Sequence, residues 1–124
     1  MLHEIIKQIR QHRIFLITAH VRLDGDALGS ELALYHLLQS LGKEAVVYNQ
    51  DKTPENYRFL PGSETIVNTL DEPDRYDAIF ILDCSELERV GDRAKEIGRG
   101  KRLINIDHHI SNSGFCHYSY IDPA

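Results

Sequence analysis

Short apolar runs alternate with helix-like segments along this chain. Apolar side chains recur at helical spacing in residues 2–12, and a continuous apolar run follows in residues 14–17. A second helical repeat covers residues 26–41, with Asp26 placed as its N-cap and Gly42 as its C-cap. The first third of the chain therefore predicts a helix, a buried strand and a longer helix.

Four further apolar segments predict strands, at residues 45–48, 76–82, 102–106 and 115–121. A weaker helical pattern lies at residues 92–97. Because helices rather than tight hairpin turns separate most of the strands, we expect crossover connections and a parallel sheet covered on both faces. The predicted fold class is doubly wound α/β with a mainly parallel sheet.

Length and composition set limits on the class of protein. The 124 residues suit one domain, and neither the 42% hydrophobic content nor any apolar run suggests a membrane span of ~20 residues. The charged N-terminus lacks the apolar core of a secretory signal, so we expect a cytoplasmic protein with no membrane partner. A net charge of -5 argues against duplex DNA as a partner.

Titratable side chains follow three of the predicted strands. They are His20, Asp24 and Asp26 after the first strand, Asp83 after residues 76–82, and Asp107, His108 and His109 after residues 102–106. Carboxyl ends of parallel strands meet at one edge of a sheet, where ligands bind. Carboxylates gathered there without a counter-charge would repel one another. We therefore expect positive charge among them.

Divalent metal ions meet this requirement. Carboxylate oxygen and imidazole nitrogen together suit Mn²⁺, Fe²⁺, Co²⁺ or Zn²⁺, and such a cluster has enough ligands for two ions that share a carboxylate. Two ions bound in this way favour hydrolysis of a phosphate ester, because they activate water and stabilise charge on the phosphoryl oxygens.

Each candidate residue also has a structural interpretation when it is taken alone. Asp26 could be only a helix cap, and His20 only a histidine at a strand end. Arg22 and Arg89 flank these segments and are candidates for contact with phosphate, although exposed arginines are more often only solvated. Cys84 is interpreted as a small buried side chain rather than a nucleophile.

The same segments carry a resemblance to a known family. HVRLDGD at 20–26, LPGSE at 60–64, ILDCSELERVG at 81–91 and NIDHHISN at 105–112 occur in order and cover essentially the whole chain. Together they resemble the DHH phosphoesterase family, and in particular its nanoRNase and pAp-phosphatase branch. The resemblance implies a Rossmann-like DHH domain.

The resemblance also implies roles for the candidate residues. Two divalent cations are expected, Mn²⁺ first, with Mg²⁺, Co²⁺, Fe²⁺ and Zn²⁺ as alternatives. In the implied arrangement His20 and Asp24 bind the first cation, Asp26 and His108 bind the second, Asp83 bridges them, His109 faces the substrate phosphate, and Asp107 orients a neighbouring histidine.

The activity that the resemblance implies is a metal-dependent phosphoesterase. Its substrates would be short oligoribonucleotides, 3'-phosphoadenosine 5'-phosphate, or both, hydrolysed by a water that two metals activate. Cyclic-dinucleotide cleavage, single-strand exonuclease action and pyrophosphate hydrolysis stay open as family activities, and so does a metal-binding domain that is catalytically incomplete. The expected partners are short single-stranded RNA or a nucleotide, and a second copy of the chain in a homodimer.

Two departures from the family pattern affect these expectations. Leu23 stands where the family usually has proline. The family also has a further metal-binding aspartate and a C-terminal substrate-binding domain beyond the region that this chain covers. We therefore expect residues 1–124 to be the N-terminal DHH domain of a longer enzyme, with weaker binding of the second cation.

Overall fold

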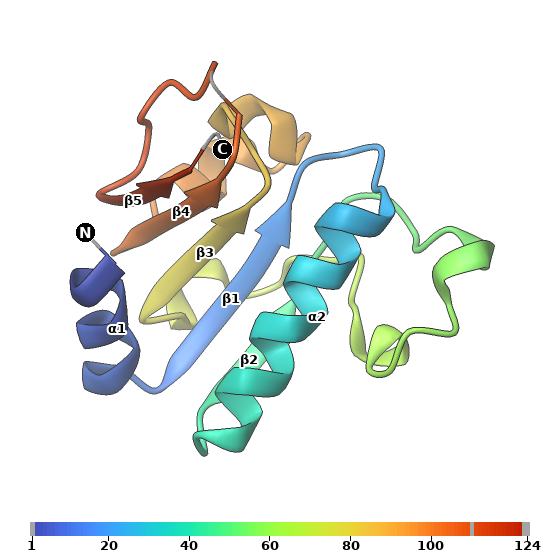
Figure 1. The fold of residues 1–124 in the computed structure, drawn as a ribbon, viewed down its shortest axis with the longest axis horizontal. Coiled ribbons are helices and arrows are strands. Elements are labelled where there is room, and N and C mark those ends of the chain that lie inside the picture. Colours follow the sequence, from blue (N-terminus) through green and yellow to red (C-terminus); the bar gives the residue numbers. More distant parts are fainter. Residues whose placement is uncertain (1, 110, 123–124) are drawn as a thin grey trace.

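A five-stranded parallel sheet forms the centre of the protein (Figure 1). The computed structural model describes residues 2–109 and 111–122. The strands are β1 (Ile14–Ala19), β2 (Glu44–Val47), β3 (Ala78–Leu82), β4 (Leu103–Asp107) and β5 (Tyr118–Ile121), in the order β2-β1-β3-β4-β5. All four neighbouring pairs are parallel. The predicted α/β class is confirmed.

Helices cover both faces of the sheet. They are α1 (Leu2–Gln11), α2 (Gly25–Ser40) and α3 (Ala94–Gly98), together with the 3₁₀ turns η1 (Glu55–Tyr57), η2 (Ser63–Thr65), η3 (Pro73–Arg75) and η4 (Leu87–Val90). The helix predicted at residues 92–97 begins two residues later, and the last strand is shorter than predicted. Within the described ranges, no helix combines the length and apolar character that crossing a bilayer requires.

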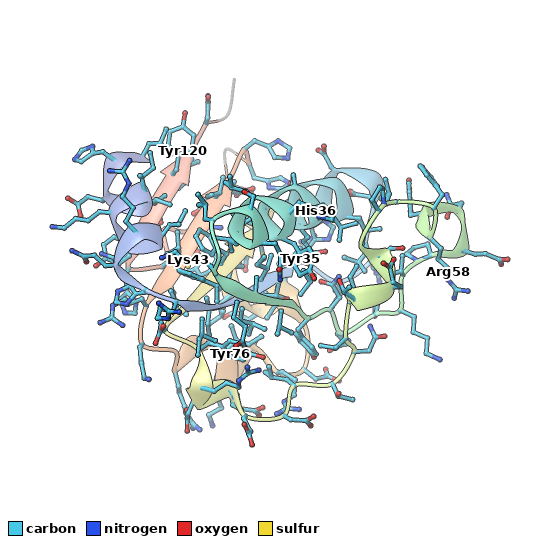
Figure 2. The ribbon with its side chains drawn as sticks, turned by 90° about the horizontal axis from the view of Figure 1, so that it is seen from below. Tyr35, His36, Lys43, Arg58, Tyr76 and Tyr120 are labelled. Carbon is cyan, nitrogen blue, oxygen red and sulfur yellow. The ribbon has the colours of Figure 1, made fainter. Side chains whose placement is uncertain are left out.

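The strands read as continuous apolar runs because each buries side chains on both faces. Phe15 and Ile17 of β1 belong to a core shared with α1 and α2, whereas Leu16 between them belongs to a second core shared with η4 and α3. Figure 2 shows Tyr35 and Tyr76 on opposite sides of the sheet, one in each layer.

The N-cap of α2 differs from the prediction. Asp24, not Asp26, caps the helix: its backbone is extended, and its side chain accepts a hydrogen bond of 2.9 Å from the N–H of Ala27. The helical repeat of leucines starts only at Leu28, so either aspartate fitted the pattern. Asp26 lies in the first turn instead, and its carboxylate is not used for capping.

The strand order creates a switch point beside β1. The chain places β2 on one side of β1 and then crosses to place β3 on the other side. Connections that leave β1 and β3 at their carboxyl ends therefore diverge, and doubly wound sheets bind ligands in the crevice that forms there.

A carboxyl group is buried where α2 packs against the end of β2. Glu31 is 0% exposed, and its Oε1 accepts a hydrogen bond of 2.9 Å from Nδ2 of Asn49. Burial raises the pKa of Glu31 to about 8, and this hydrogen bond opposes the shift. Oε2 of Glu31 and Oδ1 of Asn49 have no partner among the described residues. A proton on Oε2 removes the buried charge and makes this oxygen a hydrogen-bond donor.

Replacing Glu31 with glutamine should remove a pH dependence of stability. The carboxyl pKa of Glu31 is about 8 in the folded protein and 4.5 ordinarily, so its contribution is complete below pH 4.5 and is lost as the pH rises to 8. We expect the free energy of unfolding of the wild type to fall across this window, and Glu31→Gln to be more stable by up to about 4 kcal/mol at pH 8. Urea denaturation at several pH values measures both.

Glu64→Gln is the matched control, because Glu64 is an exposed acid on η2. It should leave the pH dependence unchanged. Parallel pH profiles for the wild type and Glu31→Gln would contradict a protonated Glu31.

Candidate metal centre

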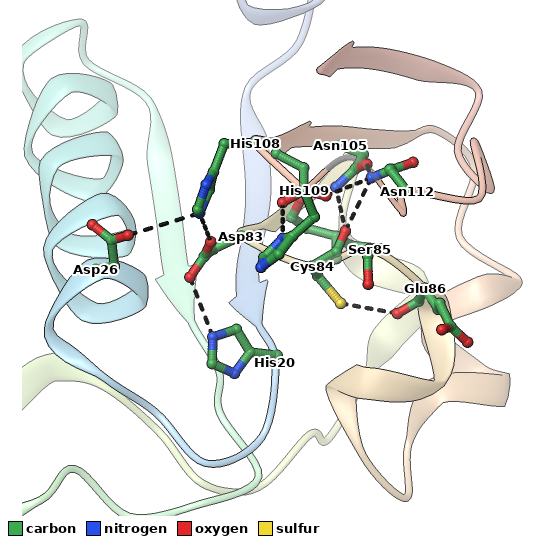
Figure 3. A network of polar contacts seen from close by, with 12 residues as sticks. His20, Asp26, Asp83, Cys84, Ser85, Glu86, Asn105, His108, His109 and Asn112 are labelled. Carbon is green, nitrogen blue, oxygen red and sulfur yellow. Dashed lines mark hydrogen bonds and ion pairs between the residues drawn. The ribbon is translucent and has the colours of Figure 1, made fainter. Parts of the chain in front are cut away.

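The ends of β1, β3 and β4 and the first turn of α2 surround a cavity of about 290 Å³ (Figure 3). Its lining includes most of the titratable residues that the sequence singled out: His20, Asp24, Asp26, Asp83, His108 and His109. The carboxyl edge of the parallel sheet thus gathers side chains that lie up to 89 positions apart in the sequence, from His20 to His109.

Asp83 lies between two imidazoles at the centre of this cavity. The carboxylate is 8% exposed, with Oδ1 2.7 Å from Nε2 of His108 and Oδ2 3.2 Å from Nε2 of His20. Asp26 lies 3.7 Å from the same nitrogen of His108, and Asp24 lies 3.9 Å from that of His20. The structure therefore forms two groups, each with one histidine and one further aspartate, and Asp83 belongs to both.

The tautomer of His20 leaves a lone pair facing Asp83. Nδ1 of His20 lies 2.6 Å from the carbonyl oxygen of Val21, which can only accept a hydrogen bond, so Nδ1 carries a proton. In the neutral imidazole, Nε2 is then an acceptor that faces another acceptor, Oδ2 of Asp83, at 3.2 Å. A cation between the two atoms resolves this contact, and histidines that bind metals commonly donate their other N–H to a carbonyl.

The same carboxylate also changes the pKa of His108. The hydrogen bond with Asp83 raises the pKa of His108 above its ordinary value, and its partial desolvation acts in the opposite direction. A proton on His108 and a metal ion compete for the same nitrogen lone pair, so the binding of a cation there should release a proton.

The backbone of Asp83 adopts an uncommon conformation. Its φ is 52°, in the left-handed region that residues other than glycine rarely occupy, although aspartate and asparagine do so more often. Asn105 of β4 is fully buried, and its Nδ2 donates to the carbonyl oxygens of Ile81 and Cys84 on either side of this residue. These bonds hold the turn that directs the carboxylate into the cavity.

Asp107 and His109 form a second pair at the end of β4. Nδ1 of His109 lies 2.5 Å from Oδ1 of Asp107, and Nδ2 of Asn112 donates to Oδ2 at 2.7 Å. Burial of Asp107 would by itself raise its pKa, but the hydrogen bonds from Asn112, His109 and the backbone hold the pKa below its ordinary value. An ionised Asp107 therefore fixes the ring of His109.

This donor set fits divalent metal ions. Ligand atoms of His20, Asp24 and Asp83 lie within 4.8 Å of one another, and so do those of Asp83, Asp107, His108 and His109. Oxygen and nitrogen ligands in this ratio suit Mn²⁺, Fe²⁺, Co²⁺ or Zn²⁺. The sequence assigned His108 to a site with Asp26, and the contact of 3.7 Å between them is compatible with that assignment.

Residues after β2 support the site, which the sequence analysis did not anticipate. Asp51 accepts a hydrogen bond of 2.7 Å from the backbone N–H of Arg22, whose φ is 61°. Oε1 of Gln50 accepts from the backbone N–H of Asp92 at 2.5 Å. Two features of the sequence could have indicated these supporting residues. They are the polar run from Asn49 to Asp51 directly after a strand and the asparagines within NIDHHISN.

The two arginines lie in different positions. Both arginines are exposed, but Arg89 of η4 lines the cavity and Arg22 does not belong to the lining. Cys84 is buried beside Asp83, and burial raises the pKa of its thiol to about 12. At neutral pH this thiol is protonated, which suits the small buried side chain that the sequence indicated and not a nucleophile.

Comparison with known proteins gives a consistent result. The sequence model described as "DHH family, N-terminal domain" matches residues 14–124. The chain is 37% identical to the bifunctional oligoribonuclease and PAP phosphatase NrnA of Thermus thermophilus, over 98% of this chain and 35% of that protein. It is 28% identical to the protein of the same description from Bacillus subtilis, over 98% of this chain and 37% of the relative.

A solved structure is also similar. The crystal structure of an exopolyphosphatase-related protein from Bacteroides fragilis superposes with a TM-score of 0.87 and 29% identity, over 98% of this chain and 38% of that one. The chain thus spans about a third of the length of the curated relatives that it matches.

Asp83→Asn should separate metal binding from folding. Asparagine tolerates the positive φ of 52° and keeps the shape of the side chain, but it removes the charge that two groups share. We expect divalent cations to bind roughly 100-fold more weakly or not at all, because even residues behind the ligands matter by about 10–100-fold. The unfolding temperature without metal should stay equal or rise, since one buried charge is gone.

Calorimetric titration with Mn²⁺ and thermal unfolding measure the two effects. Asp71→Asn makes the same change of charge at an exposed position outside this cavity, and it should alter neither quantity. Equal affinity for Mn²⁺ in both variants would contradict a central role for Asp83.

Proposed function

Since this chain belongs to the DHH family, we propose that it is the catalytic domain of a metal-dependent phosphoesterase acting on short oligoribonucleotides or on 3'-phosphoadenosine 5'-phosphate. The observation that carries this proposal is the carboxylate of Asp83, placed between two groups of metal-binding side chains. The names of the relatives in Thermus thermophilus and Bacillus subtilis, which describe these two activities, support the choice of substrate.

Under this proposal, His20 and Asp24 would hold one divalent cation, Asp26 and His108 would hold a second, and Asp83 would contribute to both sites, since it contacts both histidines. When bound, the cations supply Lewis acidity, which stabilises charge on phosphoryl oxygens and makes water a stronger nucleophile. We propose Mn²⁺ as the physiological cation. The side chains themselves neutralise the cations and fix where a phosphate group can lie.

His109 has a different role in the proposal. Its Nδ1 proton is directed at Asp107, so Nε2 is left for the substrate, and His109 lines the cavity. From there the ring, as an imidazolium with a second proton on Nε2, would donate a hydrogen bond to a phosphate oxygen in the transition state. Asp107 acts as a positioning residue, since it contacts the ring of His109 and is only 5% exposed.

A second candidate function is cation binding without turnover. The match with this chain covers only about a third of the length of each relative. Some groups that bind substrate in the relatives can therefore lie in the parts of those proteins that the match does not cover. In that case the same domain would serve as an assembly or regulatory module. We also propose a cytoplasmic location. We propose in addition that the chain forms a homodimer, and light scattering can test this oligomeric state.

The first experiment is a hydrolysis assay with a two-nucleotide RNA and with 3'-phosphoadenosine 5'-phosphate. With Mn²⁺ present, we expect release of mononucleotides or of inorganic phosphate, and a chelator should abolish it. Calorimetry on the same sample reports the binding of Mn²⁺. Binding without release of either product would favour the second candidate function, and no binding would contradict both.

Asp107→Asn should lower kcat by roughly 10–100-fold with little change in KM, because the ring of His109 loses its charged partner. The NH₂ group of the new asparagine would also face the N–H of Asn112 or of His109, and two donors cannot hydrogen-bond to each other. Steady-state kinetics with the two-nucleotide RNA separate the two constants. Asp74→Asn, at an exposed position of η3, is the control, and an equal fall in both variants would exclude the positioning role.

A further inference from the structure

The cavity at the metal centre is lined by two kinds of side chain. Carboxylates and imidazoles form most of the lining, whereas Ser85, Arg89 and Ser111 contribute to it without belonging to the groups that could hold a metal. In the view of Figure 3, Asp26 lies on one side of Asp83, and Ser85 lies on the other, where His109 is also seen. Ser85, Arg89 and Ser111 offer hydrogen-bond donors rather than metal ligands.

The guanidinium of Arg89 carries an unpaired charge. Among the described residues it forms no ion pair and no side-chain hydrogen bond, although three aspartates line the same cavity. Arg89 lines the cavity together with Cys84 and the candidate ligand Asp83.

The backbone around Arg89 is held in place. Its carbonyl oxygen accepts a hydrogen bond of 2.7 Å from the N–H of Val21, which ties η4 to the segment after β1. Gly91 follows with a φ of 110°, a backbone conformation that residues other than glycine rarely adopt, and a Cβ there would meet the side chains of Gln50 and Val21. The segment that carries Arg89 is thus fixed relative to the metal ligand His20, which lies one residue before Val21.

The two serines lie on segments that are joined to each other. The backbone N–H of Ser113 donates to the carbonyl oxygen of Ser85 at 2.9 Å, and its hydroxyl donates to the same oxygen at 3.2 Å. This contact connects the turn after β3 to the segment after β4. Ser85 and Ser111 both line the cavity, and their hydroxyls have no hydrogen-bond partner among the described residues.

We infer that Arg89, Ser85 and Ser111 form a subsite for a second phosphate group of the substrate. A guanidinium and two hydroxyls are the donors that suit the oxygens of a phosphate monoester, and they hold no metal. The cavity of about 290 Å³ is at the small end for a ligand site. The phosphate group at the metal centre and the phosphate group in this subsite must therefore belong to the same nucleotide or to adjoining nucleotides. This inference rests on the proposed function and narrows its substrates to nucleotides with a terminal phosphate.

The test compares a two-nucleotide RNA that carries a 5'-phosphate with the same RNA without it. In the presence of Mn²⁺, we expect the wild type to prefer the phosphorylated RNA by roughly 10–100-fold in kcat/KM, mainly through KM, because the interaction is a charge-assisted one. Arg89→Gln should reduce this preference to near one. Ser85→Ala and Ser111→Ala should each reduce it by a smaller factor.

Arg99→Gln is the matched control, since Arg99 is exposed beyond α3, does not line the cavity, and loses the same charge on substitution. It should keep the full preference. Cleavage of both RNAs at equal rates by the wild type, or a preference that Arg89→Gln retains, would overturn the subsite and leave the proposed function intact.

Absence of cleavage of either RNA would count against the proposed function and not by itself against the subsite. Equilibrium binding of the same two RNAs to metal-free protein then decides the matter. Tighter binding of the phosphorylated RNA to the wild type, lost in Arg89→Gln and kept in Arg99→Gln, supports the subsite. Equal binding of the two RNAs, or no binding of either, overturns it.

Discussion

The carboxylate of Asp83 between two imidazoles is the contact on which the rest of the site depends. One oxygen faces His108 and the other faces His20, whose available nitrogen is an acceptor in the neutral ring. Aspartates from the start of α2 add further negative charge nearby. Like charges and opposed acceptors at these distances are stable only with positive charge among them, and this requirement explains why the site suits metal ions.

The fold meets this requirement with polar groups placed behind the ligands. Asn105 holds the backbone on both sides of Asp83, where φ is positive, and Asn112 donates to Asp107. Asp51 holds the segment after β1 in a similar way through the N–H of Arg22. These residues lie on β4, in the segment after β4 and in the segment after β2. The geometry of the candidate ligands is therefore a property of the carboxyl edge of the sheet and not of any single motif.

The same edge combines two kinds of chemistry. Asp26 and Asp83 lie near His108, whereas Arg89, Ser85 and Ser111 add hydrogen-bond donors to the same cavity. Helix α2, which carries Asp26, is also joined to the end of β2 through the buried pair of Glu31 and Asn49. A neutral carboxylic acid at that position gives the helix a polar anchor without adding a further negative charge to the helix that carries the candidate ligands Asp24 and Asp26.

The sequence by itself determined the α/β class and the candidate ligands, because buried parallel strands are continuously apolar and the ligand-bearing segments directly follow them. It did not determine which aspartate caps α2, since Asp24 and Asp26 both fit the pattern before the repeat. Nor could it show that Asp83 faces both histidines or that Arg89 lines the same cavity. Those contacts join residues that are distant in sequence, and only strand order and packing bring them together.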